Sequence, residues 1–300
     1  AHLGEFGGRD NIAKTKSEIY QGLSDTGTAI VPFGDDYFDT LLNNAQQFTQ
    51  NILTFGERDV SLADAGVDMQ QAKEIGLTDE DTVLLMGDVF ADDVEVGNTS
   101  TFSLNFNFDI DEIESQNVTL NFAGEHNISN ALAAAACAQA LGLSIDDIAK
   151  GLDAAKPAKG RLNFIEFGRH TLIDDTYNAN PSAVIAATQV LVSQGAPTLL
   201  VLGDIGELGD AAQEEHRKLG EAIAASGVTV LYTVGELTPV TVAQAQASGM
   251  QAQAYPDKAT LLAAIKDKLT SSDDAWHILF KGSRYMRMEQ IIDELTRQPF

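Results

Sequence analysis

The second half of the chain alternates between short apolar segments and segments with a helical pattern. The apolar segments are HTLIDDTY, TLLVLGD, VTVLYTVG and HILFKG, and helical patterns such as PSAVIAATQVLVSQG and AAQEEHRKLGEAIAAS lie between them. Apolar strands connected by helices are typical of a parallel sheet that is covered on both faces. The alternation therefore predicts an α/β, doubly wound domain.

Polar residues follow each of these apolar segments. They occupy Asp174–Asn180, Gly203–Glu207, Gly235–Glu236 and Lys281–Arg284. In an open parallel sheet, ligands bind outside the carboxyl ends of the strands. Turn formation alone explains the glycine and acidic residues after a strand, but it does not require the amides of DDTYNAN or the guanidinium of KGSR. We therefore expect a binding crevice at this edge of the sheet.

The first half mixes several patterns. The alternation in STFSLNFNFDI and NVTLNFAG predicts two antiparallel strands. Two helices are predicted after them, HNISNALAAAACAQALG and SIDDIAKGLDAA, the second with Ser144 as its N-cap. The acidic stretch from about Ser61 to Gly97 is weakly patterned and is interpreted as a surface insertion. KPAKGRL interrupts the periodicity, which predicts domains at 1–157 and 158–300.

The charge and cysteine content exclude several classes of function. With 19 basic and 44 acidic residues, the net charge is −25. Such a chain does not bind nucleic acid by counterion release, nor an anionic membrane surface. The single cysteine, Cys137, lies in an alanine-rich segment and is expected in the core, and it leaves no intrachain disulfide. No signal peptide or apolar run of membrane length is present in the sequence, so we expect a cytoplasmic protein without membrane insertion.

Lys16 is unusual because a helix from Asn11 to Leu23 would place it among apolar side chains, at about 100° per residue. The apolar residues of that stripe are Ile12, Ile19, Tyr20 and Leu23. A snorkelling lysine with its ammonium in water is the favoured interpretation. The alternative is burial, which lowers the pKa of the amine. A neutral amine takes up carbon dioxide to form a carbamate, an oxygen ligand suited to Mg²⁺, and His2 would be an available nitrogen ligand.

Two nucleotide-binding fingerprints are missing from the sequence. The glycines of GDIGELG are spaced G-x-x-G-x-x-G, which argues against a dinucleotide site. No G-x-x-x-x-G-K-[ST] loop occurs, so the sequence lacks the usual grip on nucleotide phosphates.

The order of the motifs closely resembles the Mur ligase family. The motifs are AHL–GEFG, AKTKSEIY, GEHNISNALAAAA, KGRL, LIDDTYNANPSA, VLGDIGELG and FKGSR, and they run from Ala1 to about Arg284. The resemblance implies the C-terminal half of the family's central ATPase domain, followed by a Rossmann-like C-terminal domain. The family's N-terminal domain for the UDP-sugar and its phosphate loop are expected to lie outside this sequence.

The resemblance implies an ATP-dependent ligase that forms an amide bond through an acyl phosphate. DDTYNAN together with GELG and KGSR is similar to the member that adds D-alanyl-D-alanine to UDP-N-acetylmuramoyl-tripeptide in peptidoglycan synthesis. ATP, Mg²⁺ and these two substrates are the implied cofactors and partners, and family members are usually monomeric. The chain alone is expected to be inactive, because nothing in it holds the β- and γ-phosphates. Two alternatives stay open: a non-catalytic fragment that binds nucleotide or dipeptide, and a related ligase with a different amine acceptor.

The resemblance also implies roles for individual residues. His2 matches a Mg²⁺ ligand, and Lys16 matches a lysine that is carried as a carbamate beside the metal. The implied nucleotide contacts are His126, Asn127, Asn130, Arg161, Asp175 (on the ribose), Tyr177 and Asn178. Tyr177, Asn178 and Asn180 are implied to lie near the phosphates and the acceptor. The implied contacts to the dipeptide carboxylate are Lys281, Ser283 and Arg284, and the guanidinium fork of an arginine suits that role.

Overall fold

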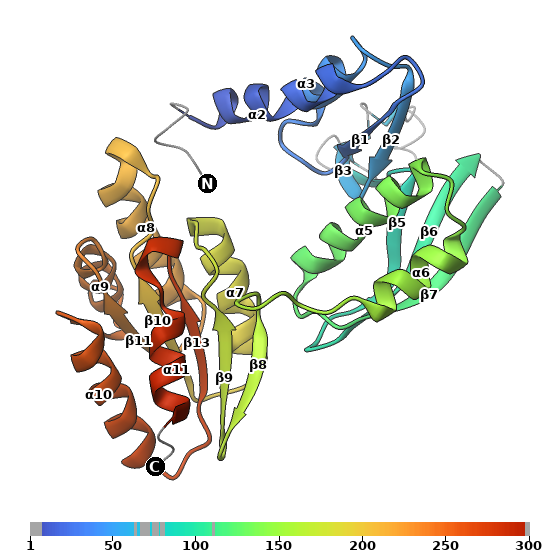
Figure 1. Cartoon of the computed structure of the whole chain (residues 1–300). Helices are drawn as coiled ribbons and strands as arrows, with labels where there is room; N and C mark the ends of the chain where they lie inside the picture. Colours follow the sequence, from blue (N-terminus) through green and yellow to red (C-terminus); the bar gives the residue numbers. More distant parts are fainter. Residues whose placement is uncertain are drawn as a thin grey trace. The chain divides into compact units, whose positions relative to one another are not determined.

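The computed structural model describes residues 8–62, 65–66, 73, 78, 82–109 and 112–297, which form two compact units (Figure 1). Residues 10–121 and 125–155 contribute the described part of one unit, here called the N-terminal unit. The described part of the other unit, here called the C-terminal unit, consists of residues 8–9, 122–124 and 156–297. In the part of the chain that the structure describes, no helix combines the length and the apolar character needed to cross a membrane.

The N-terminal unit contains a five-stranded mixed sheet of order β1-β2-β5-β6-β7. Its strands are β1 (Thr28–Pro32), β2 (Asn51–Phe55), β5 (Val89–Glu95), β6 (Ser100–Asp109) and β7 (Glu112–Leu120). The first three are parallel, whereas β6 is antiparallel to both β5 and β7. A separate antiparallel pair consists of β3 (Glu57–Ser61) and β4 (Thr82–Met86). The prediction of two antiparallel strands at β6 and β7 is confirmed.

The predicted insertion between Ser61 and Gly97 is wrong in part. Its last portion forms β5, which is an inner strand between β2 and β6. Val89 and Phe90 are buried at the start of β5, but Asp92–Glu95 are exposed. The strand therefore has only two strongly buried residues before an acidic segment, which is too short a pattern to be recognised from the sequence.

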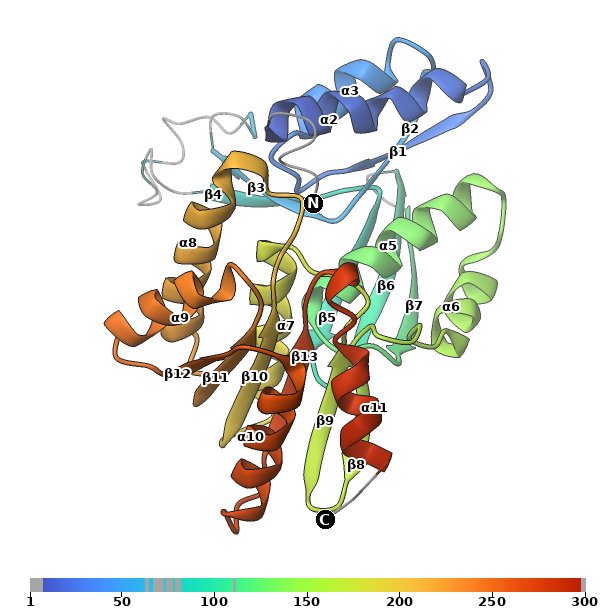
Figure 2. The ribbon, with the colours of Figure 1, turned by 60° about the vertical axis from the view of Figure 1, so that its left-hand side comes forward.

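The helices of the N-terminal unit are α2 (Arg9–Ser17), the 3-10 helix η1 (Glu18–Gly22), α3 (Phe38–Ala45), α5 (Glu125–Ala140) and α6 (Ile145–Ala154). Helix α5 lies against β1, β2 and β5 (Figure 2). As predicted, Ser144 caps α6, with its hydroxyl oxygen accepting from the Asp147 backbone N–H at 3.3 Å.

The prediction that Lys16 faces the core is wrong, because α2 packs through its small residues. The residues buried in this segment are Ala13, Ser17 and Tyr20. Asn44 of α3 donates from Nδ2 to the Ser17 hydroxyl oxygen at 2.8 Å, so the two helices lie close together. Of the predicted stripe, Tyr20 is buried, but Ile19 in η1 is 76% exposed and Lys16 is exposed as well, so Lys16 lies outside the packed face.

The expectation of a buried Cys137 is also wrong. Helix α5 buries one stripe at helical spacing, consisting of Ile128, Ala131, Leu132, Ala135 and Ala136. Cys137 follows that stripe by one residue, about 100° around the helix, and is exposed. The alanines are small enough to be buried or exposed without a clear signal, so the sequence does not distinguish the two faces.

The C-terminal unit contains a six-stranded sheet of order β12-β11-β10-β13-β9-β8. Its strands are β8 (Asn163–Phe167), β9 (His170–Asp175), β10 (Thr198–Gly203), β11 (Val230–Val234), β12 (Gln251–Tyr255) and β13 (His277–Lys281). Five of these six strands are parallel, whereas β8 runs antiparallel and forms a hairpin with β9. The predicted α/β, doubly wound sheet is confirmed, although β8 and β12, its two edge strands, were not predicted.

Helices cover both faces of this sheet, and two hydrophobic clusters fill the layers. The helices are α7 (Pro181–Ser193), α8 (Ala212–Ala225), α9 (Thr238–Ala247), α10 (Lys258–Thr270) and α11 (Glu289–Arg297), with short 3-10 helices η2 (Gly209–Ala211) and η3 (Arg284–Met286). Leu200 and Leu202 of β10 pack with α7, α8 and α9, whereas Leu199 and Val201 pack with α10 and α11. Alternate residues of one strand thus face opposite layers, which is why β10 is apolar throughout.

Candidate functional site

The loops that follow β9, β10 and β13 meet at one edge of the C-terminal sheet, here called the carboxyl edge. The Ser283 N–H donates to the Asp204 carbonyl oxygen at 3.0 Å, and the Ser283 hydroxyl oxygen accepts from the Gly206 N–H at 2.8 Å. The Arg284 N–H donates to Asn178 Oδ1 at 3.2 Å. The motifs DDTYNAN, GDIGELG and KGSR, which are far apart in sequence, are therefore in direct contact.

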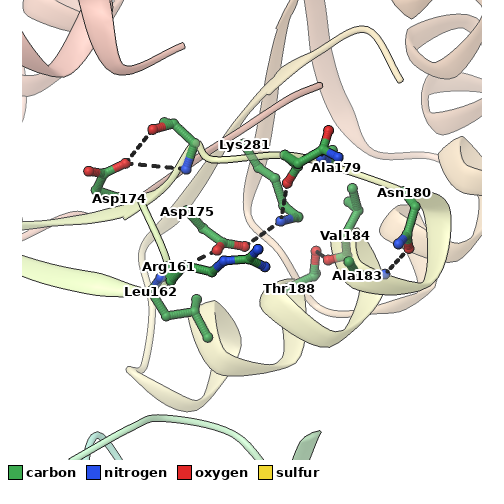
Figure 3. A network of polar contacts seen from close by, with 12 residues as sticks. Arg161, Leu162, Asp174, Asp175, Ala179, Asn180, Ala183, Val184, Thr188 and Lys281 are labelled. Carbon is green, nitrogen blue, oxygen red and sulfur yellow. Dashed lines mark hydrogen bonds and ion pairs between the residues drawn. The ribbon is translucent and has the colours of Figure 1, made fainter. Parts of the chain in front are cut away.

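Asp175 and Lys281 form a buried ion pair at this edge, with Nζ and Oδ2 separated by 2.5 Å (Figure 3). Lys281 is 3% exposed and Asp175 is 8% exposed. The second carboxylate oxygen of Asp175 accepts from the Leu162 N–H at 3.3 Å, and Lys281 Nζ also donates to the Asn178 carbonyl oxygen at 3.0 Å. The two residues thus connect the Gly160–Leu162 turn, the loop after β9 and the end of β13.

Other polar residues of the carboxyl edge also bond within the unit. Asp174 accepts from the backbone N–H and the hydroxyl of Thr176. Asn180 caps α7, with Oδ1 accepting from the Ala183 N–H at 2.8 Å, as Figure 3 shows. Local turn and cap formation therefore accounts for Asp174 and Asn180, while the predicted contact of Asn180 with substrate stays a prediction.

Three predicted contact residues, Arg161, Tyr177 and Arg284, present their side chains to solvent. Tyr177 is 50% exposed, and the Arg161 guanidinium lies over its ring at 4.4 Å from the centroid. The Arg284 side chain is 58% exposed and pairs with Glu289 at 3.0 Å. A flat cation–aromatic pair and an exposed guanidinium are suited to a planar ligand and to a carboxylate, respectively.

Asp204, in the GDIGELG segment, has an internal role. Its buried carboxylate accepts from the backbone N–H groups of Glu236 (2.7 Å), Leu237 (3.0 Å) and Thr238 (2.9 Å), and so caps the start of α9. At Gly235, a Cβ atom would lie 2.2 Å from Asp204 Oδ1, so only glycine fits there. Turn formation, which already explained Gly235–Glu236 from the sequence, describes this segment well.

Two titratable groups near the GDIGELG segment have shifted pKa values. Burial lowers the pKa of His216, whose Nε2 accepts from the Ile205 N–H at 3.4 Å and whose Nδ1 lies 3.0 Å from the Thr241 hydroxyl. Burial also raises the pKa of Tyr285, and the negative charges of Asp204 and Glu236 add to that effect. His216 is therefore a neutral, structural histidine at pH 7.

The residues predicted in the N-terminal unit are only partly described. His2 lies outside the described residues, and Lys16 is exposed near the end of α2. Asn130 Nδ2 donates to Asn127 Oδ1 at 3.2 Å in the first turns of α5, where His126 is exposed. Among the described residues, no group of three or more histidine, cysteine, aspartate or glutamate side chains could hold a metal ion.

A pocket of about 490 Å³ in the N-terminal unit was not predicted from the sequence. It lies beyond the carboxyl ends of β1 and β2, beside the first turns of α5. Its lining residues are Pro32, Gly34, Asp35, Phe55, Gly56, Glu57, Ala91, Val94, Glu125, Ile128, Ser129 and Leu132. At helical spacing, Asn127 and Asn130 lie on the opposite face of α5 from Ile128 and Leu132. A sequence signal for this pocket was available, because ligand sites often follow the carboxyl ends of parallel strands. It was missed because the short apolar pattern of β5 did not identify that strand as part of the sheet.

Comparison with known families identifies both units. The model of the Mur ligase middle domain matches residues 1–138, and that of the Mur ligase glutamate ligase domain matches residues 160–284. The chain belongs to the Mur ligase family. The resemblance expected from the order of its motifs is confirmed.

Individual Mur ligases match this chain over almost its whole length. The UDP-N-acetylmuramoyl-tripeptide–D-alanyl-D-alanine ligase of Escherichia coli K12 is 33% identical over 98% of the chain, and the Bacillus subtilis enzyme of the same name is 30% identical over all of it. The chain spans 58% of the length of each. The solved structure of MurF from Acinetobacter baumannii is 38% identical, with a TM-score of 0.82 over 99% of this chain and 58% of that one.

Proposed function

We propose that this chain is part of an ATP-dependent ligase that joins D-alanyl-D-alanine to UDP-N-acetylmuramoyl-tripeptide. One observation carries the proposal: relatives that are named for this reaction align with the chain through both of its units. The convergence of DDTYNAN and KGSR at the carboxyl edge supports it. In this proposal, residues 1–157 belong to the central domain and residues 158–300 form the C-terminal domain.

We assign nucleotide binding to Arg161, Asp175 and Tyr177. The stacked guanidinium and phenol ring are exposed and suit a base or ribose. The Asp175 carboxylate is 8% exposed and already holds Leu162 and Lys281, but its oxygens have further lone pairs, which suit ribose hydroxyls. Arg284 is the residue assigned to the dipeptide carboxylate, because its guanidinium is exposed at the same edge. Mg²⁺, as the family implies, would neutralise phosphate charge. His2, the ligand that the family resemblance implies, lies outside the described residues.

The reaction is tested with the full-length gene product. ATP-dependent phosphate release should require both the UDP-tripeptide and D-alanyl-D-alanine, and mass spectrometry should identify the amide product. Turnover with a different amine acceptor would replace this proposal with that of a related ligase.

Arg284→Ala tests the assignment of the dipeptide. We expect a KM for D-alanyl-D-alanine raised at least about tenfold, as for the loss of a charge-assisted hydrogen bond, with the KM for ATP unchanged. Arg297→Ala is the matched control, because Arg297 is also exposed and paired with a glutamate, but lies at the far end of α11. Equal effects of the two substitutions would contradict the assignment.

The chain by itself is proposed to bind without turnover. Calorimetric titration with ADP and with D-alanyl-D-alanine measures binding, and a phosphate-release assay measures turnover. Binding of either ligand without phosphate release is the expected result, whereas steady ATP hydrolysis by the purified chain would contradict it. The cytoplasmic location and the monomeric state remain predictions.

A further inference from the structure

We propose that Lys281 is a positioning residue that acts through Asp175, and that it does not bind the dipeptide carboxylate. Its ammonium holds together three segments of the carboxyl edge: the Gly160–Leu162 turn, the loop after β9 and the loop after β13. This inference rests on the proposed function, in which Arg161 and Asp175 contact the nucleotide.

The Gly160–Leu162 turn has a backbone that needs external support. Leu162 has φ +51°, in the left-handed region that non-glycine residues rarely adopt. Such a conformation persists only where the surrounding structure holds it. The Leu162 N–H donates to Asp175 Oδ1, and the other oxygen of the same carboxylate is held by Lys281. Lys281 therefore supports the turn through Asp175.

The same turn places Arg161. The Tyr177 N–H donates to the Gly160 carbonyl oxygen at 3.0 Å, and a Cβ atom at Gly160 would lie 2.9 Å from Tyr177 N. This close approach brings the Arg161 guanidinium over the Tyr177 ring. A shift of the Asp175 carboxylate would thus move Leu162 and, with it, the neighbouring guanidinium.

The ammonium also organises the other side of the carboxyl edge. Lys281 Nζ donates to the Asn178 carbonyl oxygen, and Asn178 Oδ1 accepts from the Arg284 N–H. With Asp175 and Asn178 as partners and 3% exposure, Lys281 already has two hydrogen bonds inside the unit. The exposed Arg284 at the same edge is better placed to meet a soluble dipeptide.

A neutral side chain cannot replace this lysine without cost. Methionine is similar in length, but it would leave the buried Asp175 carboxylate without its cation. Removal of both charges in a Lys281→Met/Asp175→Asn double variant avoids the unpaired buried charge, and we expect it to keep the unit folded. Lys281→Arg retains the charge and several donors, so it should restore part of the arrangement.

The first test is amide hydrogen exchange of the chain without ligand. In Lys281→Met, peptides covering 158–164, 176–181 and 282–286 should exchange about tenfold faster, because about one hydrogen bond is lost. The amides of β10 and β11 should keep their protection. Lys258→Met is the matched control, because the Lys258 ammonium also donates to a backbone carbonyl but at Arg287. If Lys281→Met unfolds, the same comparison is made with the double variant. Unchanged exchange in a folded variant would overturn the proposal.

The second test is calorimetric affinity for ADP and for D-alanyl-D-alanine. Lys281→Met should weaken ADP binding about tenfold, and Lys281→Arg should recover part of that loss. Loss of dipeptide binding with unchanged exchange and unchanged ADP affinity would show direct contact and overturn the proposal. If the unmodified chain binds no ADP, the proposed nucleotide site fails, whereas the exchange data still decide the positioning role.

Discussion

Asp204 offers the sharpest test of how the carboxyl edge is built, because one buried carboxylate accepts three backbone N–H groups at the start of α9. In Asp204→Ala, the N–H of the buried Thr238 loses its acceptor without gaining water, at a cost of about 2 kcal/mol. The N–H groups of Glu236 and Leu237 are better exposed and are rehydrated, at about 0.5 kcal/mol each. We therefore expect the C-terminal unit to lose about 3 kcal/mol of unfolding free energy, more than a typical N-cap contributes.

Asp204→Asn separates the role of the acceptor from that of the charge. The amide oxygen can still accept from Leu237 and Thr238, while the amide nitrogen faces the Glu236 N–H. The expected loss of unfolding free energy is about 1 kcal/mol, because one hydrogen bond is lost and two become neutral.

The assay is urea unfolding at pH 7, followed by the fluorescence of Trp276. Trp276 is the single tryptophan of the chain and is 5% exposed in the C-terminal unit, so its signal reports that unit alone. Asp210→Ala is the control, because Asp210 lies in η2, which follows the loop of Asp204, and carries the same charge but is exposed. Equal unfolding free energies for Asp204→Ala and Asp210→Ala would contradict a capping role for Asp204.

Three further predictions concern histidine, glycine and cap positions. The pKa of His216 is lowered from 6.5 by burial, so its contribution to stability is complete above about pH 6.5 and is lost as the pH falls. Between pH 7 and 5, the urea midpoint read from tryptophan fluorescence should therefore fall less in His216→Gln than in the unmodified chain. Gly235→Ala would bring Cβ against the Asp204 carboxylate, so the α9 cap is lost and the C-terminal unit should be destabilised by about 3 kcal/mol in the same assay. Gly249 also has a positive φ but no close neighbour, so Gly249→Ala should reduce the unfolding free energy by less. Ser144→Ala should cost the N-terminal unit about 1 kcal/mol, measured by far-UV circular dichroism in urea, since it removes the α6 cap.

The architecture of the C-terminal unit could be predicted from the sequence, since the signals for it are local. Each central strand is buried on both faces, and each helix between strands has its own periodicity, so the alternation alone predicts a doubly wound sheet. The polar residues after these strands then have to lie at one edge. The same local signals predicted the β6–β7 pair and the Ser144 cap. They failed for β12, where QAQAY is half polar because an edge strand buries few residues, and for β5, where only two residues are strongly buried.

The contacts of the polar side chains, in contrast, are set by the assembled fold. Lys281 and Asp175 are 106 residues apart, and Asp204 and Thr238 are 34 apart, yet each pair is in direct contact. A sequence shows that a lysine or an aspartate is present, but not whether its partner comes from the protein or from a ligand. Lys16 and Cys137 illustrate the same limit, because the face on which a helix packs depends on the element opposite it. Burial and hydrogen bonding are properties of the assembled fold, so these roles could not be assigned before the fold was known.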